Sequence, residues 1–474
     1  MDAIEMRRQS GTGPIVGTSI NPSTGDVIQT YHGYTPDEVE QVLSEAHDAQ
    51  KRWQRRHVSE RAAVLHAIGD ALDRKAKALA RIVTLEMGKP ISEAEGEIRK
   101  CAWVCRYYAE HGPNMLTSEP AAIEGADVVV RYDPLGTILA VMPWNFPFWQ
   151  VFRFAAPALI AGNALLMKHA PTTFGCALAI ERLVVEAGLP LGVLANAVVG
   201  PSAVGTLIAD PRISALTLTG SDRAGQAVAA SAGGALKKSV LELGGSDAFI
   251  VLDDADVDLA VAGAVAGRCM NSGQSCCASK RFMVHYSIAP DFERAFARAL
   301  EALVVGAPER PETQIGPLAR ADLRDTLHQQ VMASVNAGAR LVTGGKYGPG
   351  PGFFYEPTLL ADVDDEMPVW TEETFGPVAA MRTFRTDDEA IALANDSDYG
   401  LCATIWTDEV ERARRLARDI DVGGVFVNRI AASDPRVPFG GVKRSGYGRE
   451  LGLHGLREFL NAKTVWVEER RKCM

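Results

Sequence analysis

The chain lacks the features of a secreted or membrane-spanning protein. It has 474 residues but only eight cysteines, which do not form the dense pattern of a disulfide framework. It contains no run of about 18 or more uninterrupted apolar residues, so no membrane span is predicted. Residues 1–5 include two acids and begin no apolar segment of the kind that a signal peptide needs. We therefore expect a cytoplasmic protein with reduced thiols.

The sequence also lacks the common signatures of nucleic-acid, metal and dinucleotide sites. Its 59 acidic residues outnumber its 49 basic residues, and the formal net charge of −10 argues against a nucleic-acid surface. No cysteine pair is accompanied by a second pair or by clustered histidines at zinc-ligand spacing, so no metal site is expected. The dinucleotide fingerprint Gly-x-Gly-x-x-Gly does not occur. Any nucleotide site must therefore use another glycine pattern.

What the sequence does have is a long alternation of apolar strands and helices. The chain is 47% hydrophobic and long enough for two or three domains. An amphipathic helix is predicted from about Ser59 to about Gly88. Further predicted strands are 127–132, 137–142, 164–168, 196–199, 215–219 and 463–467, and helices follow at 150–160, 177–187 and 202–209. A second alternating region runs from 248 to about 441. This order predicts parallel, doubly wound sheets with a core that includes Leu65, Ile68, Leu72, Val141 and Leu166.

The most informative stretch is 271–277, Asn-Ser-Gly-Gln-Ser-Cys-Cys. The small neighbours Gly273 and Ser275 allow a substrate to approach the thiol of Cys276 closely. The backbone N–H of the same cysteine can help to hold an oxyanion. These features predict a nucleophile turn. The alternative is that Cys276 and Cys277 are buried small hydrophobes, as most free cysteines are.

A second stretch, 241–245, places a carboxylate in an apolar run that ends on two glycines. Its sequence is Leu-Glu-Leu-Gly-Gly, with the carboxylate at Glu242. Burial penalises the charged form of a carboxyl group and raises its pKa toward that of a useful general base. Glu242 and Cys276 are far apart in the sequence, so only tertiary folding can bring them together.

Glu-Leu-Gly-Gly, followed at this spacing by Gly-Gln-x-Cys, resembles the aldehyde dehydrogenase superfamily, and the resemblance covers essentially the whole chain. It implies that Cys276 attacks an aldehyde and that Glu242 activates the deacylating water. It also implies an oxyanion hole made by the Asn145 side chain and the Cys276 backbone N–H. The implied fold is α/β, with two doubly wound parallel-sheet domains and a small β oligomerisation arm. The implied parts are a cofactor-binding domain (1–116 and 134–243), a catalytic domain (244–458) and the arm (117–133 and 459–474).

The same resemblance implies NAD or NADP as cofactor. The segment 217–225 contains Gly-Ser-x-x-x-Gly, where a strand enters a helix whose free N–H groups can face a pyrophosphate. Family members that prefer NAD often have a glutamate three residues after the lysine that is Lys168 here. Because that position is Pro171, no carboxylate repels a 2′-phosphate, and the choice between NAD and NADP stays open. The implied cofactor-binding residues are Pro143, Trp144, Lys168, Pro171, Gly220, Ser221, Gly225, Leu243, Glu373 and Phe375.

Two residues indicate a substrate with a distal carboxylate. A guanidinium can hold a carboxylate through two hydrogen bonds, and Arg153 coincides with an arginine that succinate-semialdehyde dehydrogenases use in this way. Ser433 falls where those enzymes place a hydroxyl for the same group. The stretches 240–247 and 423–428 resemble the bacterial Sad type of these enzymes. We therefore expect succinate semialdehyde as substrate and a homodimer or homotetramer as the assembly.

One position departs from the family pattern. The arginine that some members carry six residues before the nucleophile is Met270 here. Arg268 or Arg436 then has to substitute for it, or the carboxylate is held more loosely.

Three alternatives to this function stay open. The same chemistry could act on glutarate semialdehyde or an aliphatic aldehyde. A cysteine hydrolase would use Cys276 without a nicotinamide, but it needs a histidine partner, and the nine histidines show no recognisable signature. A non-catalytic binding role leaves the set of Cys276, Glu242 and Asn145 unexplained. No role is assigned to Cys277.

Overall fold

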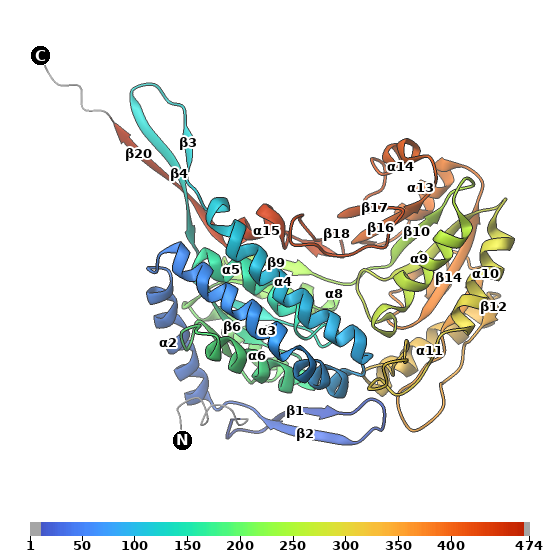
Figure 1. The fold of residues 1–474 in the computed structure, drawn as a ribbon, viewed down its shortest axis with the longest axis horizontal. Coiled ribbons are helices and arrows are strands. Elements are labelled where there is room, and N and C mark those ends of the chain that lie inside the picture. The colour runs from blue at the N-terminus through green and yellow to red at the C-terminus, as the bar shows by residue number, and fades with distance from the viewer. Residues whose placement is uncertain (1–10, 469–474) are drawn as a thin grey trace, which may run out of the picture.

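Two helix-covered β-sheets form the body of the molecule, and a three-stranded ribbon projects from it (Figure 1). The computed structural model describes residues 11–468. Residues 1–10 of the predicted cofactor-binding domain and 469–474 of the predicted arm lie outside the described residues. An N-terminal hairpin of β1 (Ile15–Ile20) and β2 (Val27–His32) lies along the lower edge of the body in Figure 1.

The first sheet is doubly wound around the strand β5. Its strands, in spatial order, are β19 (Gly446–Tyr447), β9 (Lys238–Glu242), β8 (Ile213–Thr219), β5 (Thr137–Val141), β6 (Ala164–Lys168) and β7 (Leu194–Asn196). All neighbours are parallel except β19 and β9. From β5 the chain adds β6 and then β7 on one side of the sheet. It then crosses to the other side of β5 and adds β8 and then β9. Ligands of such sheets bind beyond the carboxyl ends of the strands at the point of reversal, which here lies between β5 and β8.

Helices cover both faces of this sheet. The helices are α2 (Pro36–Trp53), α3 (Val58–Met87), α4 (Ile91–Met115), α5 (Trp149–Ala161), α6 (Phe174–Glu186), α7 (Val204–Ala209) and α8 (Asp222–Gly234). Because side chains alternate along a strand, Ile138 packs into the cluster under α3, α4 and α5, whereas Leu139 packs into the cluster under α2, α7 and α8. The strands are therefore apolar on both sides, as buried parallel strands require.

Most of the predicted core residues in this half of the molecule are confirmed. Four of the five predicted core residues are at most 2% exposed, namely Leu65, Ile68, Leu72 and Leu166. The prediction for Val141 was wrong, because this residue is only partly buried at the last position of β5, where the sheet opens. The predicted strand 196–199 was displaced, since β7 ends at Asn196. The last residue pair between β6 and β7 is Met167 with Asn196, so the ladder stops there.

The second sheet is built in the same way. Its strands, in spatial order, are β12 (Arg340–Thr343), β13 (Thr358–Ala361), β14 (Val378–Phe384), β11 (Ser279–His285), β10 (Asp247–Val251), β16 (Cys402–Trp406) and β17 (Gly424–Val427). Phe249 packs under α9 (Val257–Cys269) and α10 (Ala289–Glu301). Ile250 packs on the other face, under α11 (Ala321–Asn336), α13 (Asp387–Asn395) and α14 (Val410–Leu416). The predicted fold class, with two parallel-sheet units, is confirmed.

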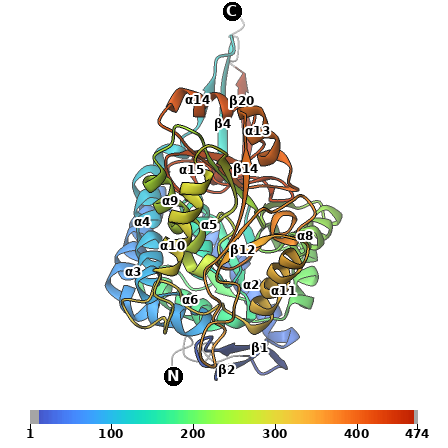
Figure 2. The same cartoon turned by 90° about the vertical axis from the view of Figure 1, so that its right-hand side faces the viewer.

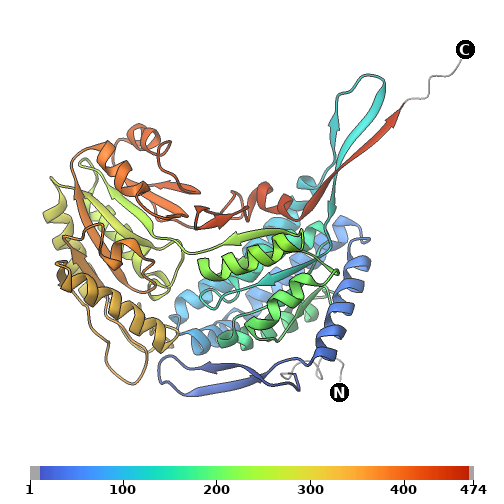
Figure 3. The same cartoon turned by 180° about the vertical axis from the view of Figure 1, so that it is seen from behind.

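A short segment joins the two sheets. Strand β9 ends at Glu242 and β10 begins at Asp247, so residues 243–246 pass from one sheet directly to the other (Figure 3). The chain also returns from the second sheet to the first, because β19 pairs with β9. The predicted Glu-Leu-Gly-Gly motif therefore lies at the junction of the two halves.

The projecting ribbon consists of β3 (Glu119–Ala121), β4 (Ala126–Pro134) and β20 (Leu460–Glu468) (Figures 1 and 2). β20 pairs antiparallel with β4 along its whole length, which confirms both predicted strands and their association. The outer edge of β20 has no neighbouring strand in this sheet, and Trp466 is 51% exposed. An exposed apolar edge strand is a surface on which another chain can pair.

The described residues contain neither a membrane-spanning helix nor a cluster of metal ligands. Between residues 11 and 468, no helix has the length and apolar character needed to cross a membrane. Within the same range, no group of three or more His, Cys, Asp or Glu side chains is arranged to hold a metal ion.

Candidate active site

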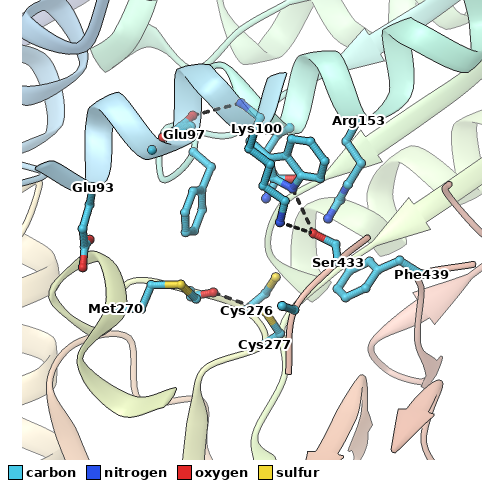
Figure 4. Close-up of a pocket in the computed structure, with 15 residues that line it drawn as sticks. Glu93, Glu97, Lys100, Arg153, Met270, Cys276, Cys277, Ser433 and Phe439 are labelled. Atoms are coloured by element: carbon cyan, nitrogen blue, oxygen red, sulfur yellow. Dashed lines mark hydrogen bonds between the residues drawn. The ribbon is translucent and has the colours of Figure 1, made fainter. Parts of the chain in front are cut away.

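A cavity of about 330 Å³ lies where elements of the two halves meet (Figure 4). Helices α4 and α5 of the first half and the turn before β11 of the second half contribute to its wall. The structure brings the predicted residues Cys276, Arg153 and Ser433 together in this cavity, although they are distant in the sequence. Among the described residues that line it there is no histidine, so a cysteine hydrolase would lack its usual base here.

The turn that carries the two cysteines has an unusual backbone. Residues Asn271 and Ser272 of the 3₁₀ turn η3 (Met270–Gly273) have φ angles of 55° and 54°. Left-handed conformations cost non-glycine residues about 1–2 kcal/mol each, so the surrounding contacts must hold the turn. Glu93 accepts a hydrogen bond from the Asn271 backbone N–H (2.7 Å), and Arg268 donates to a carbonyl oxygen of the turn (2.6 Å). The conformation is thus fixed by helices on either side of the cavity.

The two arginines considered as substitutes at the Met270 position do not reach the cavity. Arg268 is fully buried and is bound to the turn described above. Arg436 is exposed and pairs with Asp434 (2.6 Å). Neither arginine is part of the cavity wall, so neither is placed to hold the carboxylate of a substrate.

Asn145 lies beside the nucleophile turn, on the loop between β5 and α5. Its Nδ2 donates to the Gln274 carbonyl oxygen (3.1 Å), and Asn271 Nδ2 donates to the Asn145 carbonyl oxygen (2.7 Å). One amide hydrogen of Asn145 remains for a ligand. In the described part of the chain, the backbone N–H of Cys276 donates to no other group. The two donors expected for an oxyanion hole are therefore close together and available.

Glu97 supports the loop that carries Asn145. Its carboxylate accepts the backbone N–H groups of Phe148 (2.8 Å) and Trp149 (2.9 Å) at the start of α5. The same carboxylate forms a buried ion pair with Lys89. An anion at a helix N-terminus satisfies free N–H groups and is stabilised by the helix dipole. Glu97 lines the cavity, but its charge is already compensated.

The adjacent thiols form one ionisable unit. A hydrogen bond from Cys276 lowers the pKa of Cys277 to about 6, and the ammonium groups of Lys100 and Lys280 act in the same direction. The same hydrogen bond raises the pKa of Cys276. The two thiols are therefore coupled, and their surroundings favour ionisation of Cys277 over that of Cys276. Lys280 also holds the turn by donating to the Cys276 carbonyl oxygen (2.8 Å).

Glu242 is a buried carboxyl, as predicted. It is the last residue of β9 and is 2% exposed. Burial raises its pKa well above the usual range, and the positive charge of Arg153 opposes this rise. Its Oε1 has no hydrogen-bond partner among the described residues. Glu242 does not line the cavity, but it lies close enough to Arg153 and Cys277 for their charges to influence it.

Arg153 lines the cavity but already has a carboxylate partner. Its guanidinium forms an ion pair with Glu450, and both side chains are 2% exposed. It also donates to Thr219 Oγ1 (3.4 Å), and its Cζ lies 5.0 Å from the centroid of the Phe439 ring. Nothing in the sequence around Glu450 pointed to this pairing, which depends on the return of the chain to the first sheet.

Ser433 contacts a residue that the sequence analysis did not select. Its Oγ accepts hydrogen bonds from Lys100 Nζ (3.1 Å) and Trp149 Nε1 (3.1 Å). Lys100 lies on α4, whose helical pattern is compatible with a solvated lysine. Only the position of α4 against the cavity distinguishes Lys100 from other lysines on helices.

The predicted phosphate-binding motif lies at the carboxyl end of β8. Gly220 follows this strand, and Ser221 caps α8 by accepting the Ala224 backbone N–H (3.3 Å). A Cβ atom at Gly225 would lie 2.5 Å from Leu243 Cδ1, so any larger residue there would have to displace the Leu243 side chain. Gly225 and Leu243 are therefore in contact at this site. The N-terminus of α8, with its free N–H groups, fits an anionic group.

The other predicted cofactor residues surround the same edge. Lys168 ends β6, makes no ion pair with any described residue, and has its pKa lowered by burial to about 8. Pro171 begins the next turn, η1 (Pro171–Thr173). Trp144, which follows Pro143 after β5, contacts the ring of Phe375 edge to face at 5.7 Å between centroids. A buried lysine without a carboxylate partner fits the hydroxyl or phosphate oxygens of a nucleotide.

Glu373 lies against the junction between the sheets. It accepts the Gly245 backbone N–H (2.9 Å) and lies 3.4 Å from Lys280 Nζ. A Cβ atom at Gly244 would lie 2.5 Å from Glu373 Oε2, and one at Gly245 would lie 2.7 Å from the Cys276 carbonyl oxygen. The junction therefore connects the predicted cofactor residue Glu373 with the nucleophile turn.

Comparison with known proteins agrees with this geometry. The model of the "Aldehyde dehydrogenase family" matches residues 12–465. The chain is 50% identical to "Succinate semialdehyde dehydrogenase [NAD(P)+] Sad" of Escherichia coli (strain K12), over 95% of this chain and 97% of that protein. It is 47% identical to "Probable succinate-semialdehyde dehydrogenase [NADP(+)]" of Synechocystis sp., over 95% and 99%.

Solved structures give the same result. The crystal structure of succinic semialdehyde dehydrogenase from Streptococcus pyogenes in complex with NADP+ superposes with a TM-score of 0.94. It is 38% identical, and the match covers 96% of this chain and 100% of that chain. The cavity with its paired thiols, the cofactor residues at the sheet edge and the match over residues 12–465 lead to one conclusion. The chain belongs to the aldehyde dehydrogenase family.

Proposed function

We propose that the protein oxidises succinate semialdehyde to succinate with NAD or NADP. The observation that carries this proposal is a single cavity with a reactive thiol pair in its wall and polar, cationic side chains, Lys100, Arg153 and Ser433, at one end. The names of the relatives above support the same substrate. An aldehyde with a distal carboxylate fits this combination, because the thiol and the cationic end act on its two ends.

In the proposed reaction, Cys276 passes its proton to the neighbouring Cys277 sulfur and attacks the aldehyde carbon, and a covalent thiohemiacetal forms. Asn145 Nδ2 and the Cys276 backbone N–H stabilise the oxyanion. A bound nicotinamide would supply the hydride acceptor, and loss of hydride from the carbon would leave a thioester on Cys276. Glu242 then takes a proton from water, whose hydroxide hydrolyses the thioester. The balance is one aldehyde, one oxidised cofactor and one water converted to one carboxylate, one reduced cofactor and two protons.

The residues for the cofactor divide into three groups. The Gly220–Ser221 turn and the start of α8 hold the pyrophosphate, with Gly225 and Leu243 packed behind them. Lys168 holds ribose oxygens beside Pro171. Glu373 and Phe375, with Pro143 and Trp144, surround the nicotinamide end.

The arm of residues 117–133 and 459–474 joins subunits into a homodimer or homotetramer. Its support is the open edge of β20 with the exposed Trp466. The division into a cofactor-binding domain (1–116 and 134–243) and a catalytic domain (244–458) is supported by the two separate sheets. The cytoplasmic location stays a prediction.

The proposal is tested by absorbance of the reduced nicotinamide. Wild-type protein is incubated with succinate semialdehyde and either NAD or NADP, and glutarate semialdehyde and hexanal are run in parallel. We expect reduction with succinate semialdehyde at the highest kcat/KM of the three aldehydes. A higher kcat/KM with glutarate semialdehyde or hexanal would assign the same chemistry to another substrate. No reduction with any aldehyde would refute dehydrogenase activity.

The substitution Pro171→Glu tests the cofactor site. A carboxylate beside Lys168 would repel a 2′-phosphate, so kcat/KM for NADP should fall by about tenfold or more, while the value for NAD should stay within about threefold. Both values are measured at saturating aldehyde. An equal fall for the two cofactors would mean that residue 171 does not face the 2′ position.

A further inference from the structure

We propose that Lys100, together with Ser433, binds the distal carboxylate of the aldehyde. The inference rests on the proposed function and specifies the chemistry of the same cavity. Lys100 and Ser433 both line the cavity and lie 3.1 Å apart between Nζ and Oγ (Figure 4).

The ammonium of Lys100 has unused hydrogen-bonding capacity. It donates to Ser433 Oγ and lies 4.2 Å from the centroid of the Trp149 ring. An ammonium has three N–H donors, so two remain after the bond to Ser433. Lys100 forms no ion pair with any residue between 11 and 468, and burial lowers its pKa. An incoming carboxylate would supply the missing negative charge.

The other charged groups in the cavity wall are already occupied or lie elsewhere. The charge of Arg153 is balanced by Glu450, and that of Glu97 is balanced by Lys89. The carboxylate of Glu93 accepts a backbone N–H and lies at the opposite end of the cavity from Lys100 (Figure 4). A substrate anion is therefore attracted to the Lys100 end.

Ser433 completes the subsite with a second donor. Its oxygen accepts from both Lys100 Nζ and Trp149 Nε1, which occupies its two acceptor positions. The hydroxyl hydrogen must then point to another acceptor, and a carboxylate oxygen beside Lys100 satisfies it. Two adjacent donors, one of them charged, form a suitable site for one carboxylate group.

The test compares Lys100→Met with Arg99→Met, on succinate semialdehyde and on butanal. Methionine keeps a long, unbranched side chain without the charge, and Arg99 is an exposed neighbour on the same helix. In Lys100→Met we expect KM for succinate semialdehyde to rise by about 10- to 100-fold, with kcat changed by less than about threefold. The kcat/KM for butanal, which has no carboxylate, should stay within about threefold. Arg99→Met should change neither substrate.

Two further measurements complete the test. Inhibition by succinate should weaken by the same factor as KM in Lys100→Met, and Lys100→Arg should restore at least part of the affinity. Lys100 also influences the pKa of Cys277, but an effect through the thiol, or a folding defect, would reduce both aldehydes equally. An equal loss, or unchanged KM for succinate semialdehyde, overturns the inference. If wild type oxidises butanal but not succinate semialdehyde, the proposed function itself fails, which is a separate result.

Discussion

Replacing Cys276 by alanine should abolish nicotinamide reduction with every aldehyde, a loss of about 10⁴-fold or more in kcat. The physical reason is that Cys276 is the proposed attacking thiol, so without its sulfur the covalent adduct from which hydride leaves does not form. The measurement is reduced-nicotinamide absorbance, with cofactor binding followed separately by fluorescence. Cofactor affinity should change little, because the side chain of Cys276 is not among the groups predicted to bind the nucleotide.

The matched control is Cys277→Ala. This variant loses the thiol whose hydrogen bond and charge raise the pKa of Cys276, so its activity should fall only moderately and its optimum should move to lower pH. The opposite pattern, an inactive Cys277→Ala beside an active Cys276→Ala, would reassign the nucleophile to Cys277. The two variants have the same loss of side-chain volume, so a packing effect alone cannot separate them.

The substitution Glu242→Gln should slow turnover by about 10²- to 10⁴-fold without preventing the first hydride transfer. Glutamine keeps the size of the side chain but cannot accept a proton from water. Rapid mixing should therefore show a burst of reduced nicotinamide close to one per active site, followed by a slow phase. Mass spectrometry of the quenched protein should show an acyl group on Cys276. Absence of both burst and acyl group would mean that Glu242 acts before the thioester forms.

The pH dependence of the same step has a defined sign. Glu242 must be deprotonated to act as a base, and burial raises its pKa. Wild-type deacylation should therefore increase with pH through that raised pKa and be weak in acid solution. In Glu242→Gln this rising limb should disappear.

The parts of the fold that depend on local pattern were predictable from the sequence. Apolar runs predicted the parallel strands and the terminal strand, whereas the association of the terminal strand with the segment of β4 came from the family resemblance. Strand ends were less predictable, because the pairing of β7 with β6 stops at Asn196 although the residues that follow it are still apolar. Val141 was misjudged because strand pattern does not show that the last residue of β5 is only partly covered.

Residues of the candidate site were predictable only where they belong to a recognisable sequence motif. Cys276, Glu242 and Asn145 were selected from short stretches, and Arg153 and Ser433 from resemblance. Lys100 was missed because a lysine on an amphipathic helix usually faces solvent. The partner of Arg153 was missed because Glu450 reaches it only after the chain has crossed to the second sheet and returned. Such pairings are set by topology, which one sequence does not display.

The close contacts at the junction affect how the motif should be read in distant relatives. A side chain at Gly244 would collide with Glu373, and one at Gly245 with the Cys276 carbonyl oxygen. Gly245 is therefore closed to other amino acids, because the atom that a side chain would meet belongs to the backbone, whereas at Gly244 that atom belongs to the movable end of the Glu373 side chain. A descendant that had lost its catalytic glutamate would still be under selection to keep Gly245 in order to fold. Persistence of Gly245 in a lineage is thus a record of architecture, and only the carboxylate of Glu242 reports on the chemistry.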